Sequence, residues 1–126
     1  MTTETMAGVS EYAHMLLKVA DIARSERFYV DLLGFTPRKA KPLADGRPFV
    51  PFMQGLALTS GGVEKSPQID HIAFKAKDVP AIAARLKRAN VKFDRDLHDG
   101  LYGLTIYVYD PDGNMIELFD EHAKMG

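Results

Sequence analysis

The sequence has no cysteine, almost no net charge and no long apolar run. Without cysteine among its 126 residues it has no disulfide bonds and no thiolate ligands, so any metal site must use His, Asp or Glu. A formal net charge of −1 offers no basic face for nucleic acid. No apolar stretch approaches the roughly 20 residues that cross a bilayer, so we expect no membrane partner. Residues 1–6 lack a basic and then apolar signal, which favours the cytoplasm.

What the sequence does contain is an internal repeat. Residues 14–21 (HMLLKVAD) return as residues 71–78 (HIAFKAKD), with the His, Lys and Asp of each copy 57 positions apart. Each copy places a histidine early in an alternating apolar segment, which is typical of a strand. Each copy also ends in an Asp where a helical pattern begins. The repeat therefore predicts two modules built alike.

Apolar periodicity and turn residues predict the same five elements in each half. The first half is expected to contain a strand at Tyr12–Val19, a helix from its N-cap Asp21 to its C-cap Gly34, and strands at Phe35–Arg38, Pro48–Met53 and Leu56–Thr59. The second is expected to contain a strand at Ile69–Ala76, a helix after the N-cap Asp78, and strands at Val91–Asp94, Leu104–Tyr109 and Met115–Phe119. Each half thus reads as βαβββ.

The predicted fold class is α+β. Two βαβββ modules are expected to form a cupped, eight-stranded mixed sheet with the helices outside, so that equivalent residues face one cavity. The predicted boundaries are an N-terminal tail at 1–9 and a single domain at 10–126, with module one at about 10–62 and module two at about 67–120. The 57-residue offset pairs Ser60 with Glu117, which makes the two halves chemically different.

His14, His71 and Glu117 are the candidate metal ligands. Two neutral imidazoles and one carboxylate form a facial triad, which leaves up to three positions open on an octahedral Fe(II) or Mn(II). A single strand histidine is more often an ordinary core or surface residue, but two at equivalent positions of a repeat favour paired ligands. Glu117 follows Ile116 and precedes Leu118, so it faces away from both. It faces either solvent or a polar cavity, where a cation would offset its desolvation.

These residues resemble the metal ligands of the vicinal oxygen chelate superfamily, also described as the glyoxalase/bleomycin resistance/dioxygenase family. The resemblance runs from Tyr12 to Phe119. Its C-terminal part, from His98 through Tyr107 to Glu117, is similar to the signature of type I extradiol dioxygenases and departs from it at Asp96. The resemblance implies that Tyr107 hydrogen-bonds a metal-bound oxygen and that His98 donates to bound substrate. Otherwise Tyr107 is an ordinary strand aromatic and His98 a loop residue.

The resemblance implies an enzyme that binds a small molecule at a metal. The leading prediction is an Fe(II)-dependent dioxygenase that cleaves a catechol-like substrate with O2, and Mn(II), Ni(II) or Zn(II) are the other metals considered. The alternative is a glyoxalase-like isomerase, lyase or transferase of the same superfamily, or a protein that binds a small molecule and confers resistance. A homodimer is expected, because the open sheets leave edges to pair.

The sequence also departs from each of these family members. Extradiol enzymes use a further acid–base histidine, and nothing in Gln54–Thr59 replaces it. Glyoxalase I uses a Glu from the first half as a fourth ligand, and Phe49–Thr59 contains no carboxylate. The chain after Glu117 contains no arginine to hold a phosphonate, as fosfomycin-type transferases require. Metal-free binding proteins are expected to lose the triad, which this sequence retains.

Overall fold

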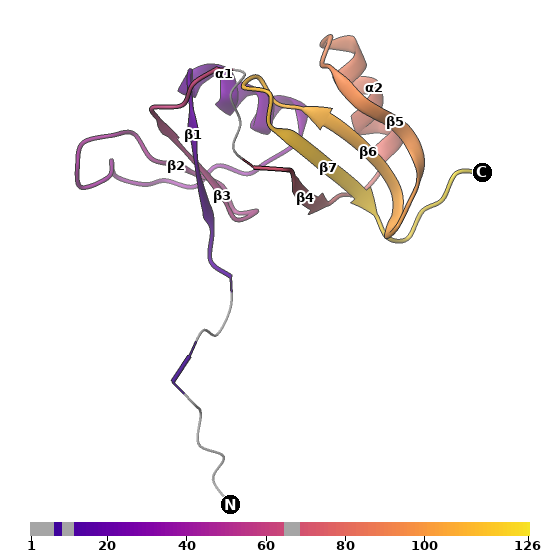
Figure 1. Cartoon of the computed structure of the whole chain (residues 1–126), viewed down its shortest axis with the longest axis horizontal. Helices are drawn as coiled ribbons and strands as arrows, with labels where there is room; N and C mark the ends of the chain where they lie inside the picture. Colours follow the sequence, from indigo (N-terminus) through magenta and orange to yellow (C-terminus); the bar gives the residue numbers. More distant parts are fainter. Residues whose placement is uncertain (1–6, 9–11, 65–68) are drawn as a thin grey trace, which may run out of the picture.

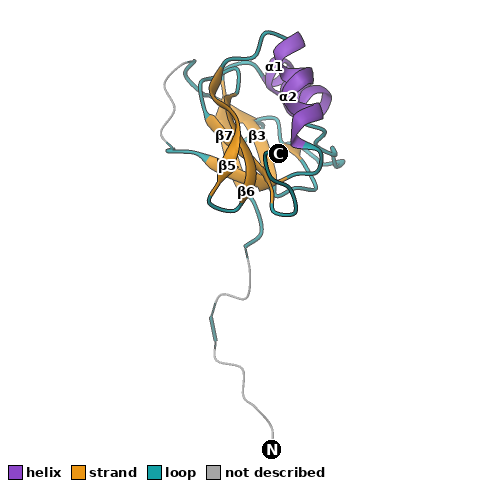
Figure 2. Ribbon diagram, turned by 90° about the vertical axis from the view of Figure 1, so that its right-hand side faces the viewer, coloured by secondary structure: helices purple, strands orange, loops and turns teal. Residues whose placement is uncertain are grey.

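The computed structural model describes residues 7–8, 12–64 and 69–126, which form two mixed β-sheets and two helices (Figure 1). The predicted tail, apart from residues 7 and 8, and the predicted start of module two at 67 lie outside the described residues. Figure 2 shows both helices on the same side of the strands. Neither helix among the described residues has the length and apolarity that a membrane crossing needs.

Module one is a three-stranded sheet with a short helix. Its sheet order is β1-β3-β2, with β1 parallel and β2 antiparallel to β3. Asp21 accepts a hydrogen bond from the backbone of Arg24 at 3.0 Å and so caps the helix, as predicted. The strand predicted at Phe35–Arg38 is reduced to a single bridge between Pro37 and Phe52. The elements are β1 (Met15–Val19), α1 (Ile22–Arg27), the π-helical turn η1 (Phe28–Leu32), β2 (Val50–Pro51) and β3 (Leu56–Ser60).

Module two is a four-stranded sheet with a longer helix. Its order is β4-β7-β6-β5, with β4 parallel to β7 and the other pairs antiparallel. Asp78 caps its helix by accepting from the backbone of Ala81 at 3.2 Å. The elements are β4 (Ile72–Lys75), α2 (Val79–Arg88), β5 (Phe93–Gly100), β6 (Gly103–Tyr109) and β7 (Met115–Asp120). The α+β class and the repeated module are confirmed, and the described strands number seven, in two sheets with β1 and β4 at their edges.

Strand register corrects one correspondence between the modules. Met15 pairs with Leu56 in the first sheet, and Ile72 pairs with Ile116 in the second. The first strand and the last strand are therefore 41 positions apart in module one and 44 in module two. The counterpart of Glu117 is Ala57, not Ser60. A constant offset fails here because module two has three more residues before its last strand.

The hydrophobic core lies between the sheets and the helices. Alternate strand residues and one face of α2 enter it, so each strand has a buried apolar face and an opposite face that is free for other uses. The core side chains include Leu17, Val19, Leu56, Leu58, Ile82, Leu86, Ile106, Val108, Ile116 and Leu118. His14, His71 and Glu117 come from the opposite faces or from the residues just before them.

Gly103, at the start of β6, allows the β5–β6 hairpin to lie against the C-terminal segment. Its φ is +133°, and a Cβ there would lie 2.1 Å from the carbonyl oxygen of Asp120. Gly103→Ala is therefore expected to lower the free energy of unfolding by about 3 kcal/mol, because strain and a backbone clash add. Gly34→Ala is the control, because φ is +78° there and no atom lies within 4 Å of the added Cβ. This variant should lower the free energy of unfolding by about 1 kcal/mol. Equal decreases in the unfolding free energy of the two variants, measured by urea titration, would contradict this account.

Candidate metal centre

His71 and Glu117 meet at the free face of the second sheet. His71 directly precedes β4, and the parallel pairing of β4 with β7 sets Ala73 beside Glu117. His71 Nε2 then lies 3.3 Å from Glu117 Oε1. Ligands at right angles on a metal about 2.1 Å away lie about 3 Å apart, so this separation fits two neighbouring positions of one coordination shell. Glu117 is only 8% exposed, which agrees with a polar cavity better than with open solvent.

Asp70 orients the His71 ring. Its Oδ2 lies 2.6 Å from His71 Nδ1, on the side of the ring away from Glu117. A carboxylate that accepts from Nδ1–H leaves the Nε2 lone pair free to bind a metal. Asp70 is not among the site residues predicted from the sequence. Its position directly before a candidate ligand was the available signal.

Tyr107 lies across the hairpin from Glu117. The antiparallel register of β6 and β7 pairs these two residues. The Tyr107 ring is edge-on to the His71 ring, with centroids 6.1 Å apart. Burial raises the pKa of the Tyr107 phenol, and the negative charge of Glu117 raises it further. Tyr107 therefore stays protonated near neutral pH and can donate a hydrogen bond.

His98 stacks on Tyr107. The ring centroids are 5.7 Å apart and the rings are inclined by 17°. His98 lies within β5, which runs well past the predicted end at Asp94, so it is not the loop residue of the alternative interpretation. Its Nδ1 is 2.8 Å from the carbonyl oxygen of Asp96, which leaves the other ring nitrogen available. His71, Tyr107 and His98 thus form a row of rings on this sheet.

His14 lies outside this group. It precedes β1 in the other sheet, is exposed, and is edge-on to Phe49 with ring centroids 6.2 Å apart. Within the part of the chain that the structure describes, no three His, Asp or Glu residues lie close enough to hold one metal ion. One copy of the chain therefore brings together two of the three predicted ligands. The strands that follow the two histidines belong to separate sheets, and the cavity shared by the two modules stays a prediction.

Module one supplies no fourth ligand at the position equivalent to Glu117. That position is Ala57, which pairs with Leu16 as Glu117 pairs with Ala73. A methyl group cannot coordinate a metal. This position therefore adds no ligand to the predicted His-His-Glu set.

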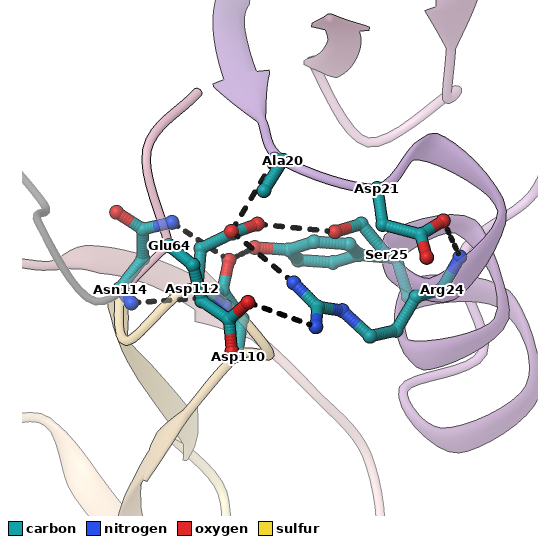
Figure 3. Close-up of polar contacts among 9 residues, drawn as sticks. Ala20, Asp21, Arg24, Ser25, Glu64, Asp110, Asp112 and Asn114 are labelled. Carbon is teal, nitrogen blue, oxygen red and sulfur yellow. Dashed lines mark hydrogen bonds and ion pairs between the residues drawn. The ribbon is translucent and has the colours of Figure 1, made fainter. Parts of the chain in front are cut away.

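A buried polar cluster holds the β6–β7 turn against module one (Figure 3). Asp110 accepts a hydrogen bond from the Tyr29 hydroxyl at 2.7 Å, and Asp112 accepts from the Ser25 hydroxyl at 3.3 Å. Arg24 lies 3.4 Å from Asp112. Both aspartates are at most 4% exposed. The sequence predicts the turn but not this cluster, which fixes the hairpin that carries Tyr107 and Glu117.

The chain matches the family model of the Glyoxalase/Bleomycin resistance protein/Dioxygenase superfamily over residues 11–118. It therefore belongs to this superfamily, whose members generally bind a divalent metal. A relative from Synechocystis sp., named "Probable lactoylglutathione lyase", is 26% identical over 125 residues, with 88% of this chain and 95% of that protein covered.

Two solved structures extend the comparison. Glyoxalase I of Leishmania major, which is trypanothione-dependent, is 28% identical with a TM-score of 0.74, covering 90% of this chain and 88% of that chain. An antibiotic-binding protein from Streptomyces sp. is 25% identical with a TM-score of 0.69, covering 92% of this chain and 98% of that chain. These names favour the predicted alternative, a glyoxalase-like enzyme or a binding protein, over the dioxygenase.

Proposed function

We propose that the protein is a divalent-metal enzyme of the glyoxalase-like kind, an isomerase, lyase or transferase whose small-molecule substrate binds the metal through oxygen. The observation that carries this proposal is the 3.3 Å approach of His71 Nε2 to the nearly buried carboxylate of Glu117. A buried carboxylate facing an imidazole is costly to desolvate unless a cation joins them. The names of the similar proteins support the reaction class.

The residues around this pair have distinct roles in the proposed site. His71 and Glu117 would hold the metal, which when bound would polarise a substrate oxygen as a Lewis acid. Asp70 keeps His71 in the tautomer that presents Nε2. The Tyr107 hydroxyl donates a hydrogen bond to a substrate oxygen beside Glu117. His98 is placed against the Tyr107 ring, where its free ring nitrogen exchanges a proton with substrate.

His14 would complete the site from a second copy of the chain. β1 and β4 are each bonded on one side only within the described residues, so each offers an edge or face to another subunit. In the dimer that we propose, two subunits are related by a twofold axis, and module one of each subunit packs on module two of the other. This arrangement would bring His14 of one copy to His71 and Glu117 of the other, and it would produce two sites per dimer.

Subunit complementation tests this arrangement. Neither His14→Ala nor Glu117→Ala alone is expected to bind metal stoichiometrically. After co-refolding in equal amounts, metal content should return to about one quarter of the wild-type value, because half the dimers are mixed and each mixed dimer has one intact site of two. Metal analysis after gel filtration measures it. No recovery, with mixed dimers demonstrated by mass tags, would show that the two residues do not meet across an interface.

The function itself is tested by metal loading followed by a substrate panel. Protein loaded with Ni(II), Zn(II), Mn(II) or Fe(II) is assayed with hemithioacetals of glutathione and of trypanothione, and with fosfomycin plus a thiol. Turnover that depends on the metal and is lost in Glu117→Ala supports the proposal. Stoichiometric metal without turnover of any panel member would count against these substrates, and absence of metal in the wild type would remove the proposal altogether.

A dioxygenase is the second candidate because His98 stacks on Tyr107 in the order and spacing of the ring-cleavage signature. The residues near Gln54–Thr59 still offer no second acid–base histidine. Anaerobic Fe(II) loading, followed by air and a panel of catechols, distinguishes it from the first candidate. Oxygen uptake with a yellow semialdehyde product would support it, and stoichiometric iron without uptake would exclude it.

A further inference from the structure

A cavity lies beside His14 in module one. Its volume is about 290 Å³, and His14 lies on its wall. The segment before β1, the segment around Arg38 and the β2 region enclose it. His14 is the module-one ligand of the proposed site, so this cavity adjoins that ligand.

Two cations line this cavity. Arg38 and Lys39 contribute to its wall, and both are exposed. Within the described part of the chain neither forms an ion pair, whereas Arg47 of the same segment is paired with Asp45 at 2.7 Å. Asp45 is the only acidic residue between positions 36 and 59. The cavity therefore has a positive charge that nothing described in the protein neutralises.

The cationic segment is held in place by its backbone. Arg38 donates from its backbone N–H to the Pro51 carbonyl at 2.9 Å, and Met53 donates to the Thr36 carbonyl at 2.9 Å. The Gln54 side chain accepts from the Thr36 backbone at 3.0 Å. These bonds anchor the segment to the sheet on both sides of Pro37. The backbone that carries Arg38, and Lys39 directly after it, is thus anchored beside the cavity.

The rest of the wall is apolar. Phe49 lies edge-on to His14, and Phe52 is 3% exposed beneath the cavity. Met53, 67% exposed, lies at its rim. An apolar wall beside two unneutralised cations matches a ligand with a small apolar body and one anionic group. Module two contributes the carboxylates of Asp70 and Glu117 to its side of the proposed site.

We propose that the substrate of this site is a small organic acid whose carboxylate or phosphonate binds Arg38 and Lys39 while its apolar part packs on Phe49. This inference rests on the proposed function for its second subunit and its metal. Salt should weaken the interaction, because the cations are exposed.

The test uses benzoate and phenylphosphonate as anionic probes and benzamide as the neutral control. Each is titrated into the full-length, metal-free protein and followed by NMR chemical shifts. Both anions are expected to bind at least about 10-fold more tightly than benzamide. The double substitution Arg38→Gln, Lys39→Gln should weaken both by at least about 10-fold. Lys41→Gln removes one positive charge from the same segment outside the cavity lining, and should change affinity by less than about twofold.

The outcomes separate this proposal from the previous one. Anion binding that persists in Glu117→Ala but is lost in the double variant supports the anion site even if the protein never binds metal. Metal binding without any anion binding overturns the anion site and leaves the metal centre standing. Equal losses in the double variant and in Lys41→Gln would also overturn it, because only nonspecific charge would then be involved.

Discussion

Replacing Glu117 with alanine is expected to abolish stoichiometric binding of Fe(II), Mn(II), Ni(II) and Zn(II). The carboxylate is the only anionic ligand of the proposed set and is nearly buried, so its removal leaves imidazoles alone to hold a dication. Even residues that only orient a ligand change metal affinity by about 10–100-fold. The loss of the ligand Glu117 should therefore lower metal affinity by more than this range. Asp70→Asn, which removes only the carboxylate that orients His71, should lower metal affinity by an amount within it.

The measurement is metal content after loading and gel filtration, with far-UV circular dichroism to confirm folding. Glu121→Ala is the matched control, because Glu121 lies on the same module and pairs with Lys75 at 3.4 Å near the surface. It should bind metal like the wild type. Glu117→Gln keeps the side-chain volume and should still lose the metal. A Glu117→Ala variant that carries as much metal as wild type would exclude Glu117 as a ligand.

Removing the hydroxyl of Tyr29 should destabilise the protein far more than removing that of Tyr109. Both hydroxyls donate to an aspartate at 2.7 Å. Tyr29 is fully buried and its acceptor, Asp110, is 4% exposed, whereas the Tyr109–Asp94 bond is exposed. A buried carboxylate that loses a donor costs about 1.5–3 kcal/mol, so Tyr29→Phe should lower the free energy of unfolding by that amount. Tyr109→Phe should change it by less than about 0.5 kcal/mol.

Asp110→Ala should have a larger effect still. Asp110 accepts from Tyr29, from the Asn114 side chain and from the backbone N–H groups of Asp112 and Asn114. Alanine leaves these four donors without their acceptor, and we expect a loss of about 3 kcal/mol or more. Urea titrations of the three variants measure their free energies of unfolding and so test the predicted order of stability. Similar values for Tyr29→Phe and Tyr109→Phe would show that burial does not strengthen this contact.

The cluster should also make stability depend on pH. Burial raises the pKa of Asp110 above its ordinary 3.8, although hydrogen bonds from Asn114 and Tyr29 oppose the rise. A raised pKa means that the folded state favours the protonated form. This contribution is full below the unfolded pKa and is lost as pH rises through the folded pKa. The stability of the wild type relative to Asp110→Asn should therefore fall as pH rises above 3.8, the ordinary pKa of an aspartate. A stability difference that increases with pH above this value would contradict the assignment.

The sequence predicted elements whose signals are local. Asp21 and Asp78 were identified as N-caps because the residue type and the following apolar period agree, and both accept the expected hydrogen bonds. The strand β5 was predicted too short. Residues 95–100, beyond the predicted end at Asp94, are mostly polar and lack apolar alternation, and backbone pairing with β6 makes them part of the strand. Phe35–Arg38 has strand composition but forms only the Pro37 bridge.

In the candidate site, too, some relations between residues could be predicted from the sequence and others required the structure. Tyr107 and Glu117 are joined by one hairpin, so their spacing along the chain was enough to place them side by side. The true counterpart of Glu117 depended on strand register, which corrected Ser60 to Ala57. Asp70, which orients the candidate ligand His71, was recognised only from its 2.6 Å contact.

The sequence by itself determined the superfamily, the repeated module and the types of side chain available to a metal, because repetition, apolar period and residue chemistry are written along the chain. Only the tertiary structure decided which of these residues meet. It joined His71 to Glu117 through a parallel strand pair and placed His14 just before β1 of the other sheet, beside Arg38 and Lys39. Contacts between sheets depend on packing between residues far apart in sequence, and no local pattern encodes that packing.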